Sequence, residues 1–315
     1  MSVRWPFARL AEQAVTRPDR LVRDNPVLLL SALQAPGTVA GLISAWNPGW
    51  QPAGTAADVA ESDTAPDVET PTPSAHLAEG IRWHGPLRVT RMLRADAGLP
   101  ATGTAASLHL VYVAEARRAR TKIVDSRHAD LLRLRYPQGL PAGAEAEAWH
   151  LVRGLAKRLR GVARLPGGPV HAPYEDPPLP GDADHAVFGH EMLPWIVLRE
   201  ILRPIAPDLT REVVPDGGGY ILRHRDLLEV RVSPAGPGTR LPHALRDRAD
   251  EAWPRSIYEL CDTSGRLPRP TSPRPPSAPA AHPARAAAAL IAEVTGGVHL
   301  DADGFPQESR TFTTR

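Results

Sequence analysis

The spacing of hydrophobic residues along the chain predicts several helices. Between Ala144 and Arg160 apolar side chains fall on one face at helical spacing, which predicts an amphipathic helix. These side chains are Trp149, Val152, Ala156 and Leu159. Similar patterns predict further helices over Val187–Ile205, Pro242–Ala252 and Ala284–Val294.

Shorter apolar or alternating runs predict strands between these helices. They are Leu108–Val113, Leu131–Tyr136, Glu212–Val214, Tyr220–Arg223, Leu228–Val232 and Val298–Leu300. Helices and strands are therefore mixed, but they do not alternate strictly along the chain. This order favours an α+β fold over a doubly wound parallel sheet.

The segment Val27–Trp46 carries no charge over the length that a membrane-spanning helix needs. Gln34 and Pro36 interrupt its apolar run near the middle, so we expect two short helices packed in a small N-terminal module. Asn25 followed by Pro26 would begin the first of them, with Asn25 as the N-cap. A membrane-associated hairpin is the alternative, and a membrane partner is not expected.

Composition divides the chain into five segments. Residues 51–80 hold six carboxylates and no Lys or Arg, and residues 266–285 are rich in Pro, so both are expected to be disordered linkers. Too few apolar side chains are present there to offset the entropy lost on ordering. The folded pieces are then a helical module at 1–50, an α+β body at 81–265 with sub-units 81–172 and 186–265, and a closing helix and strand at 286–315.

A near-repeat links two parts of the body. Arg127–Tyr136 and Arg223–Val232 share six of ten residues, including the pattern Arg-His-x-Asp. We interpret them as a duplicated β-hairpin unit in which Asp tightens the turn. The alternative is an acid–base site, in which carboxylates orient imidazoles, made of His128, Asp130, His224 and Asp226.

The densest group of metal-ligand residue types precedes the helix predicted over Val187–Ile205. It consists of Asp182, Asp184, His185 and His190. Divalent metals accept such mixtures of carboxylate and imidazole, and a metal-dependent hydrolase would use them. The helical two-histidine zinc motif is excluded, however, because Pro194 stands where the second histidine is needed. A polar loop is the preferred interpretation, and no cofactor or metal is expected.

Positive charge is concentrated between residues 81 and 170, which hold 16 Lys or Arg against 6 Asp or Glu. On the helix predicted over Ala144–Arg160, three basic residues are expected to form a stripe beside the apolar face. They are Arg153, Lys157 and Arg160. Because a basic stripe can neutralise phosphates, nucleic-acid binding is an alternative function.

Cys261 is the single cysteine, so an intramolecular disulfide and a thiolate metal site within one chain are excluded. A reducing cytoplasm is the simplest location. The sequence has no Gly-x-Ser-x-Gly motif, and no Gly-rich phosphate loop appears. We therefore expect a soluble, non-enzymatic binding or adaptor protein with a protein partner, ahead of nucleic-acid binding and metal-dependent hydrolysis.

Overall fold

The computed structural model describes residues 22–31, 36–50, 74–96, 99, 107–114, 117–119, 129–173, 182–214, 218–225, 227–247, 254–263 and 282–307. The chain forms two compact units, Met1–Pro177 and Pro178–Arg315. Each unit contains helices and antiparallel strands, so the predicted α+β class is confirmed.

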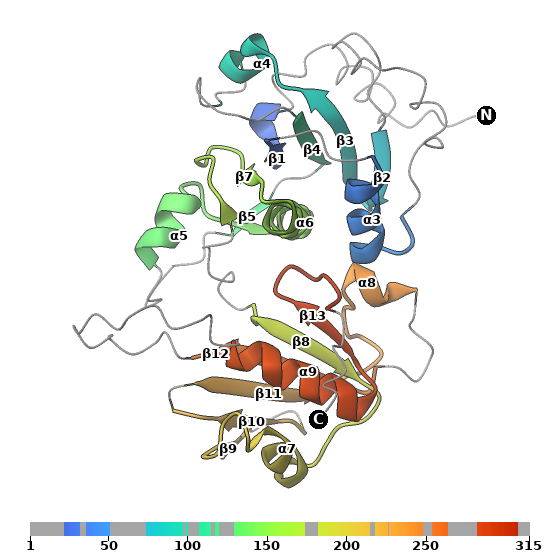
Figure 1. The fold of residues 1–315 in the computed structure, drawn as a ribbon, viewed down its shortest axis with the longest axis vertical. Helices are drawn as coiled ribbons and strands as arrows, with labels where there is room; N and C mark the ends of the chain where they lie inside the picture. The colour runs from blue at the N-terminus through green and yellow to red at the C-terminus, as the bar shows by residue number, and fades with distance from the viewer. Residues whose placement is uncertain are drawn as a thin grey trace, which may run out of the picture. The chain divides into compact units, whose positions relative to one another are not determined.

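The first unit is built on a five-stranded antiparallel sheet (Figure 1). In spatial order its strands are β2 (Ser74–Ala78), β3 (Ile81–Arg88), β4 (Ser107–Val113), β1 (Val27–Leu30) and β7 (Val162–Arg164). A separate pair joins β5 (Arg117–Ala119) to β6 (Leu140–Ala142). The helices are α3 (Pro36–Trp46), α4 (Arg91–Asp96), α5 (Ala129–Arg135) and α6 (Ala144–Leu159).

The first of the two helices expected at the N-terminal end is instead strand β1. All four of its residues are buried, and it pairs with β4 on one side and β7 on the other. A central strand that is covered on both faces is continuously apolar, so its local pattern resembles that of a buried helix. Asn25 is not a helix cap; its side-chain oxygen accepts a hydrogen bond from the amide of Val113 at 2.9 Å. The second expected helix forms as α3.

Replacing Asn25 by Ala is expected to lower the free energy of unfolding by about 1–3 kcal/mol, because the buried Val113 amide then loses its acceptor. Urea unfolding measures the change. Asn47→Ala is the comparison, since its amide donates to the carbonyl of Leu77 at a partly exposed position and should cost less. Equal costs for the two variants would contradict this role of Asn25.

Helix α6 forms where the amphipathic pattern predicts it, and it packs against the sheet. Trp149 is fully buried, donates its indole N–H to the hydroxyl of Tyr136 at 3.0 Å, and meets that ring edge to face. The helix ends at Arg160, which adopts a left-handed conformation. The next residue, Gly161, cannot be larger, because a Cβ there would lie 2.8 Å from the carbonyl oxygen of Leu29.

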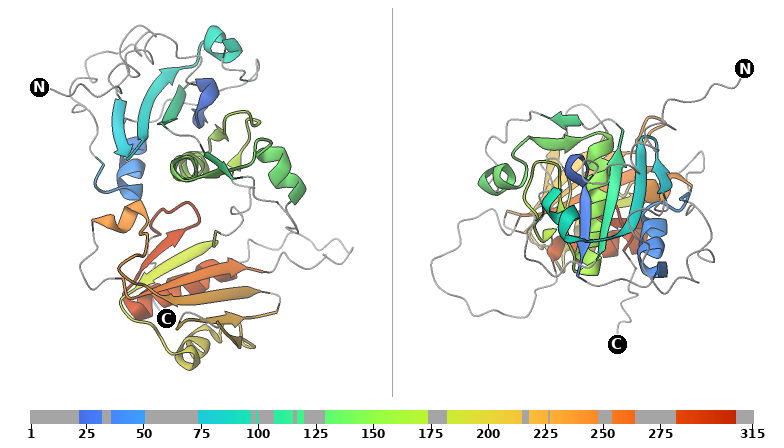
Figure 2. Two further views of the ribbon diagram at one scale, coloured as in Figure 1. Left: turned by 180° about the vertical axis from the view of Figure 1, so that it is seen from behind. Right: turned by 90° about the horizontal axis from the view of Figure 1, so that it is seen from above.

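The second unit is built on a six-stranded antiparallel sheet. Its spatial order is β13 (Val298–Asp301), β8 (His185–Gly189), β12 (Ser256–Asp262), β11 (Leu228–Pro234), β10 (Tyr220–Arg223) and β9 (Thr210–Val213). Two helices, α7 (Trp195–Leu202) and α9 (Pro283–Thr295), pack on one face (Figure 2). The short α8 (His243–Arg246) contributes to a smaller cluster with Phe188 and Leu300 on the other face.

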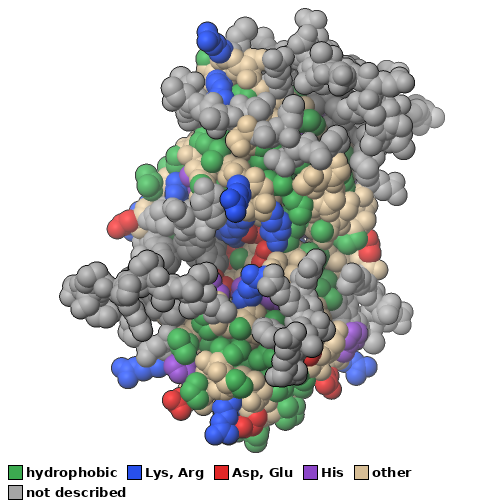
Figure 3. All heavy atoms as spheres, in the orientation of Figure 1, with side chains coloured by type: hydrophobic (Ala, Val, Ile, Leu, Met, Phe, Trp, Pro, Cys, Tyr) green, Lys and Arg blue, Asp and Glu red, His purple; other side chains and the backbone are tan. Residues whose placement is uncertain are grey.

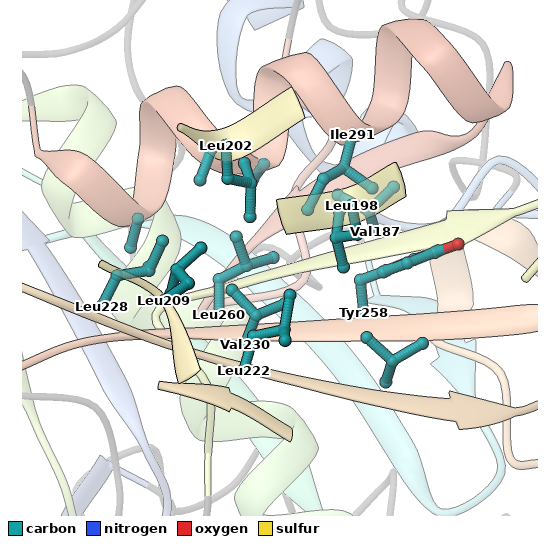
Figure 4. Close-up of a cluster of buried hydrophobic side chains, with 14 of the residues drawn as sticks. Val187, Leu198, Leu202, Leu209, Leu222, Leu228, Val230, Tyr258, Leu260 and Ile291 are labelled. Atoms are coloured by element: carbon teal, nitrogen blue, oxygen red, sulfur yellow. The ribbon is translucent and has the colours of Figure 1, made fainter. Parts of the chain in front are cut away.

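The main core of the second unit lies between α7, α9 and the sheet (Figure 4). Leu198, Leu202 and Ile291 from the helices meet alternate residues of the strands. The strand residues include Val187, Leu222, Leu228, Val230, Tyr258 and Leu260. This period-two burial leaves the side chains between them on the opposite face.

Three predicted elements of the body are corrected. Leu131–Tyr136, expected as a strand, lies within α5 apart from its last residue. Val187–Ile205, expected as one helix, begins in strand β8, continues through a loop and ends around α7. The helix expected over Pro242–Ala252 is the four-residue α8, with residues 248–252 outside the described part of the chain. Strand β12 was not predicted.

Sheet pairing also crosses boundaries that composition indicated. β1 from the expected N-terminal module pairs with β4, and β13 from the expected C-terminal segment pairs with β8. The division between the two units falls between the predicted sub-units 81–172 and 186–265. Of the two expected linkers, residues 51–73 and 266–281 lie outside the described residues. Residues 74–80 belong instead to the β2–β3 hairpin, and residues 283–285 begin α9.

Within the described ranges, no helix combines the length and the apolar character needed to cross a bilayer. The uncharged stretch that raised this question divides into the four-residue β1 and the eleven-residue α3.

Candidate functional site

The two Arg-His-x-Asp segments are not equivalent. Asp130 lies in the first turn of α5, and its exposed carboxylate pairs with Arg133 at 3.0 Å. His224 follows β10, and its backbone N–H donates to the carbonyl of Leu228 to close the β10–β11 hairpin. His128 and Asp226 lie outside the described residues. The predicted duplication is therefore wrong, because one copy enters a helix and the other a strand.

The predicted basic stripe on α6 is also corrected. Arg153 is fully buried, Lys157 is half-buried and only Arg160 is exposed. The guanidinium of Arg153 lies 3.5 Å from the imidazole of His150. A helix that packs on more than one side buries polar positions next to its apolar face, and an amphipathic pattern does not show which ones. These three residues therefore do not form one surface for phosphates.

The four metal-ligand candidates are dispersed around β8. Asp184 accepts a hydrogen bond from the backbone N–H of Asp262 at 2.6 Å, which joins the chain before β8 to the end of β12. Asp182 is half-buried, and His190 is exposed just beyond the other end of β8. Across the described part of the chain, no three His, Cys, Asp or Glu side chains converge as metal ligands.

His185 has a partner that the sequence did not indicate. Its Nδ1 lies 3.1 Å from Nε2 of His299, with ring centroids 5.0 Å apart and planes inclined by 68°. The two residues lie on neighbouring strands, where Asp301 is directly opposite His185. Burial, followed by the nearby His185, lowers the pKa of His299 to about 4, against the opposite effect of Asp301.

A second polar pair lies at the same end of the sheet. Nδ1 of the exposed His282, immediately before α9, is 2.8 Å from a carboxylate oxygen of the nearly buried Asp262. The carboxylate of Asp301 accepts the amides of Asp303 and Phe305 and so holds the turn after β13. These contacts hold this end of the fold together.

The loop between β8 and α7 is held by buried hydroxyl groups. Tyr258 accepts the amide of Leu193 at 2.8 Å and donates to the carbonyl of Glu191 at 2.9 Å, and Ser256 donates to the same carbonyl at 2.7 Å. Tyr220 donates to the carbonyl of Leu193. Burial raises the pKa of both tyrosines, so their hydroxyls stay protonated to a higher pH than those of exposed tyrosines. The start of α7 is therefore rigidly placed.

The first residue of α7, Trp195, has a partly buried ring that two cations contact. The guanidinium of Arg199, one turn along α7, lies 5.4 Å from the ring centroid of Trp195, and that of Arg211 on β9 lies 5.5 Å from it. Arg211 is opposite the buried Leu222 in the sheet, so it is on the face that carries α7. Such cation–π contacts hold all three side chains in place.

Two apolar side chains follow Trp195 on the outside of the helix. Ile196 is 52% exposed and Val197 is 44% exposed. We call these five residues, Trp195, Ile196, Val197, Arg199 and Arg211, the α7–β9 surface. The sequence analysis did not indicate this surface, because the helix predicted over Val187–Ile205 does not show which of its apolar side chains stay exposed.

Charges elsewhere on the second unit are mixed in sign. In the lower part of Figure 3, basic, acidic and apolar side chains lie next to one another. On the sheet face opposite α7, the buried carboxylate of Glu229 contacts Arg223 at 3.0 Å and Arg231 at 2.8 Å. Arg223 also reaches Glu212 at 2.7 Å. These side chains stabilise the sheet through mutual pairing.

Comparisons with known proteins leave the function to be argued from this geometry. No family model matches the chain, and no curated protein or solved structure is significantly similar to it.

Proposed function

We propose that the chain is a non-enzymatic protein-binding or adaptor protein and that its second unit binds a protein partner through the α7–β9 surface. The observation that carries the proposal is the exposed pair Ile196 and Val197, which follow the partly buried Trp195 in α7; two arginines contact the Trp195 ring. Trp and Arg are enriched among the residues that dominate binding energy at protein interfaces.

The surface is also suited to binding because it is already ordered. The hydroxyls of Tyr258 and Ser256 hold the preceding loop, and Arg199 and Arg211 restrict the ring of Trp195. A partner would therefore lose less side-chain entropy on binding than at a flexible surface. Complete burial of an aliphatic side chain yields about 1.5–3 kcal/mol, so covering the two half-exposed side chains adds roughly 1 kcal/mol each.

The rival functions gain less support. The catalytic and metal-ligand candidates that lie within the described residues belong to separate local contacts, as for Asp130 with Arg133 and Asp184 with the amide of Asp262. Burial of Arg153 removes one of the three side chains on which nucleic-acid binding was based. Neither observation weakens a role in protein binding.

Site-specific photo-crosslinking tests the proposal. A photoreactive amino acid at Ile196 is expected to form a discrete adduct with a partner in cell extract, and excess unlabelled protein should compete for it. The same amino acid at Leu134 is the matched control, since Leu134 is 64% exposed on α5 of the other unit. Identical adducts from both positions, or none from Ile196, would refute the proposal.

A substitution pair then tests the surface itself. Val197→Glu is expected to reduce the adduct formed at Ile196 by about tenfold or more, because a carboxylate would be desolvated in an apolar contact. Val294→Glu places the same charge on α9 at a side chain that is 48% exposed, and it should leave the adduct unchanged. Equal unfolding midpoints for the two variants would show that neither effect arises from misfolding.

A further inference from the structure

A pair of imidazole nitrogens meets at the edge of the second sheet. His185 stands at the start of β8 and His299 lies in the edge strand β13, and their nearest nitrogens are 3.1 Å apart. In the register His185 is opposite Asp301 and His299 is opposite Val187. Both side chains therefore lie on one face of the sheet, as diagonal neighbours.

This separation is close to that of two ligands on one metal ion. Imidazole nitrogens bind Zn²⁺ at about 2.0–2.1 Å, so two of them at the tetrahedral angle are about 3.3–3.4 Å apart. The observed distance of 3.1 Å between the two nitrogens is shorter than this by only a few tenths of an ångström. Both residues are also held by the backbone of paired strands, so little ordering is needed before an ion binds.

We propose that His185 and His299 form a two-histidine chelate for a divalent ion that prefers imidazole, of the class Zn²⁺, Ni²⁺ or Cu²⁺. Nδ1 of His185 and Nε2 of His299 are the ligand atoms. The proton now shared between them moves to the other nitrogen of the ring that carries it, so two neutral rings bind the ion without net proton release. The proposal does not rest on the protein-binding function.

Charged groups near the pair affect its affinity for a cation in opposite directions. Asp301, which is opposite His185 in the sheet and holds the turn after β13, favours positive charge at His299, whereas Arg285 at the start of α9 opposes it. Because no third side chain among the described His, Cys, Asp and Glu converges with these two, water or a group from a bound molecule completes the coordination. The site is therefore an open, exchangeable one, unlike a closed structural zinc site.

The test is titration of the untagged full chain with Zn²⁺, and separately with Ni²⁺, by isothermal calorimetry at neutral pH. The expected result is one site per chain, with affinity reduced about tenfold or more in His185→Gln, which loses one of the two ligands. His190→Gln and His282→Gln are matched controls, because these exposed histidines flank the same sheet, and both variants should bind as the parent does.

Imidazole nitrogen NMR provides a readout that does not depend on substitution of the buried His299. Addition of Zn²⁺ should shift Nδ1 of His185 and Nε2 of His299 to the range of metal-bound nitrogens. Absence of binding, equal affinity in His185→Gln, or shifts confined to other histidines would overturn the proposal, and in the last two cases the ion is an adventitious surface ion only.

Discussion

Acidification from about pH 7 to about pH 4 is expected to remove several kcal/mol of stability, with the second unit affected most. Burial is the main cause that lowers the pKa of His109, His243 and His299 to about 4. The folded protein keeps these rings neutral, whereas the unfolded chain takes up protons below the ordinary value of about 6.5. Their contribution is fully present above about pH 6.5 and is lost as the pH falls towards 4.

By about pH 4 each of these histidines is expected to have cost roughly 3 kcal/mol of stability relative to neutral pH, on the scale of 1.36 kcal/mol for each pKa unit. His243 faces Arg240 and Arg246, and His299 faces His185, Arg285 and Asp301, so both belong to the second unit. Urea unfolding at a series of pH values, followed separately for the two units, measures the effect.

The variants His243→Gln and His299→Gln are expected to flatten the pH dependence between about pH 6.5 and about pH 4, even if they lower stability at neutral pH. Glu229 serves as an internal marker, because Arg231 and Arg223 lower its pKa against the effect of burial. The contribution of Glu229 to stability is lost only as the pH falls below the ordinary carboxyl range. An unchanged slope in both histidine variants would contradict the assignment.

Replacement of Trp149 by Ala is expected to lower the free energy of unfolding of the first unit by about 3–5 kcal/mol, the range for removing a fully buried aromatic side chain. The substitution would leave a large cavity in the core next to the middle of α6. It would also remove the edge-to-face contact with Tyr136 and the hydrogen bond to the Tyr136 hydroxyl. Urea unfolding monitored by circular dichroism gives the value.

Tyr136→Phe separates the hydrogen bond from the packing, since it keeps the ring and removes only the hydroxyl. It is expected to cost about 1–3 kcal/mol, because the indole N–H of Trp149 would be left buried without this acceptor. If Trp149→Ala cost no more than Tyr136→Phe, the packing of Trp149 would not be the main contribution of α6 to the core.

Segments whose pattern is long or strictly periodic could be predicted from the sequence. The helix over 144–160 and the closing helix are observed as α6 and α9, and the strands β4, β10, β11 and β13 form close to their predicted positions. In these elements the local spacing of apolar residues agrees with the face that is finally buried, so local and tertiary preferences coincide.

Short mixed segments could not be assigned in this way. Leu132 in α5 and Tyr136 just after it are buried at a helical spacing of four, whereas Leu134 between them is 64% exposed. A strand would have buried all three, because alternate residues of a strand share one face. The sequence of this segment fits a helix and a strand equally well. Only the packing of the first unit shows that Leu134 faces solvent.

The candidate sites show the same limit. His185 was identified as a candidate ligand, but its partner His299 is 114 residues away and reaches it only because β13 pairs with β8. Trp195 meets Arg211 through the adjacency of α7 and β9. Arg153 was expected in an exposed basic stripe with Lys157 and Arg160, yet it is buried.

The sequence by itself therefore determined the α+β class, the most periodic helices and strands, and the exclusion of an intramolecular disulfide. Tertiary structure decided which strands pair, which charged side chains are buried and which apolar ones stay exposed at the α7–β9 surface. The physical reason is that periodicity reports contacts within a few residues. Burial and site geometry, by contrast, depend on strands and helices brought together from distant parts of the chain.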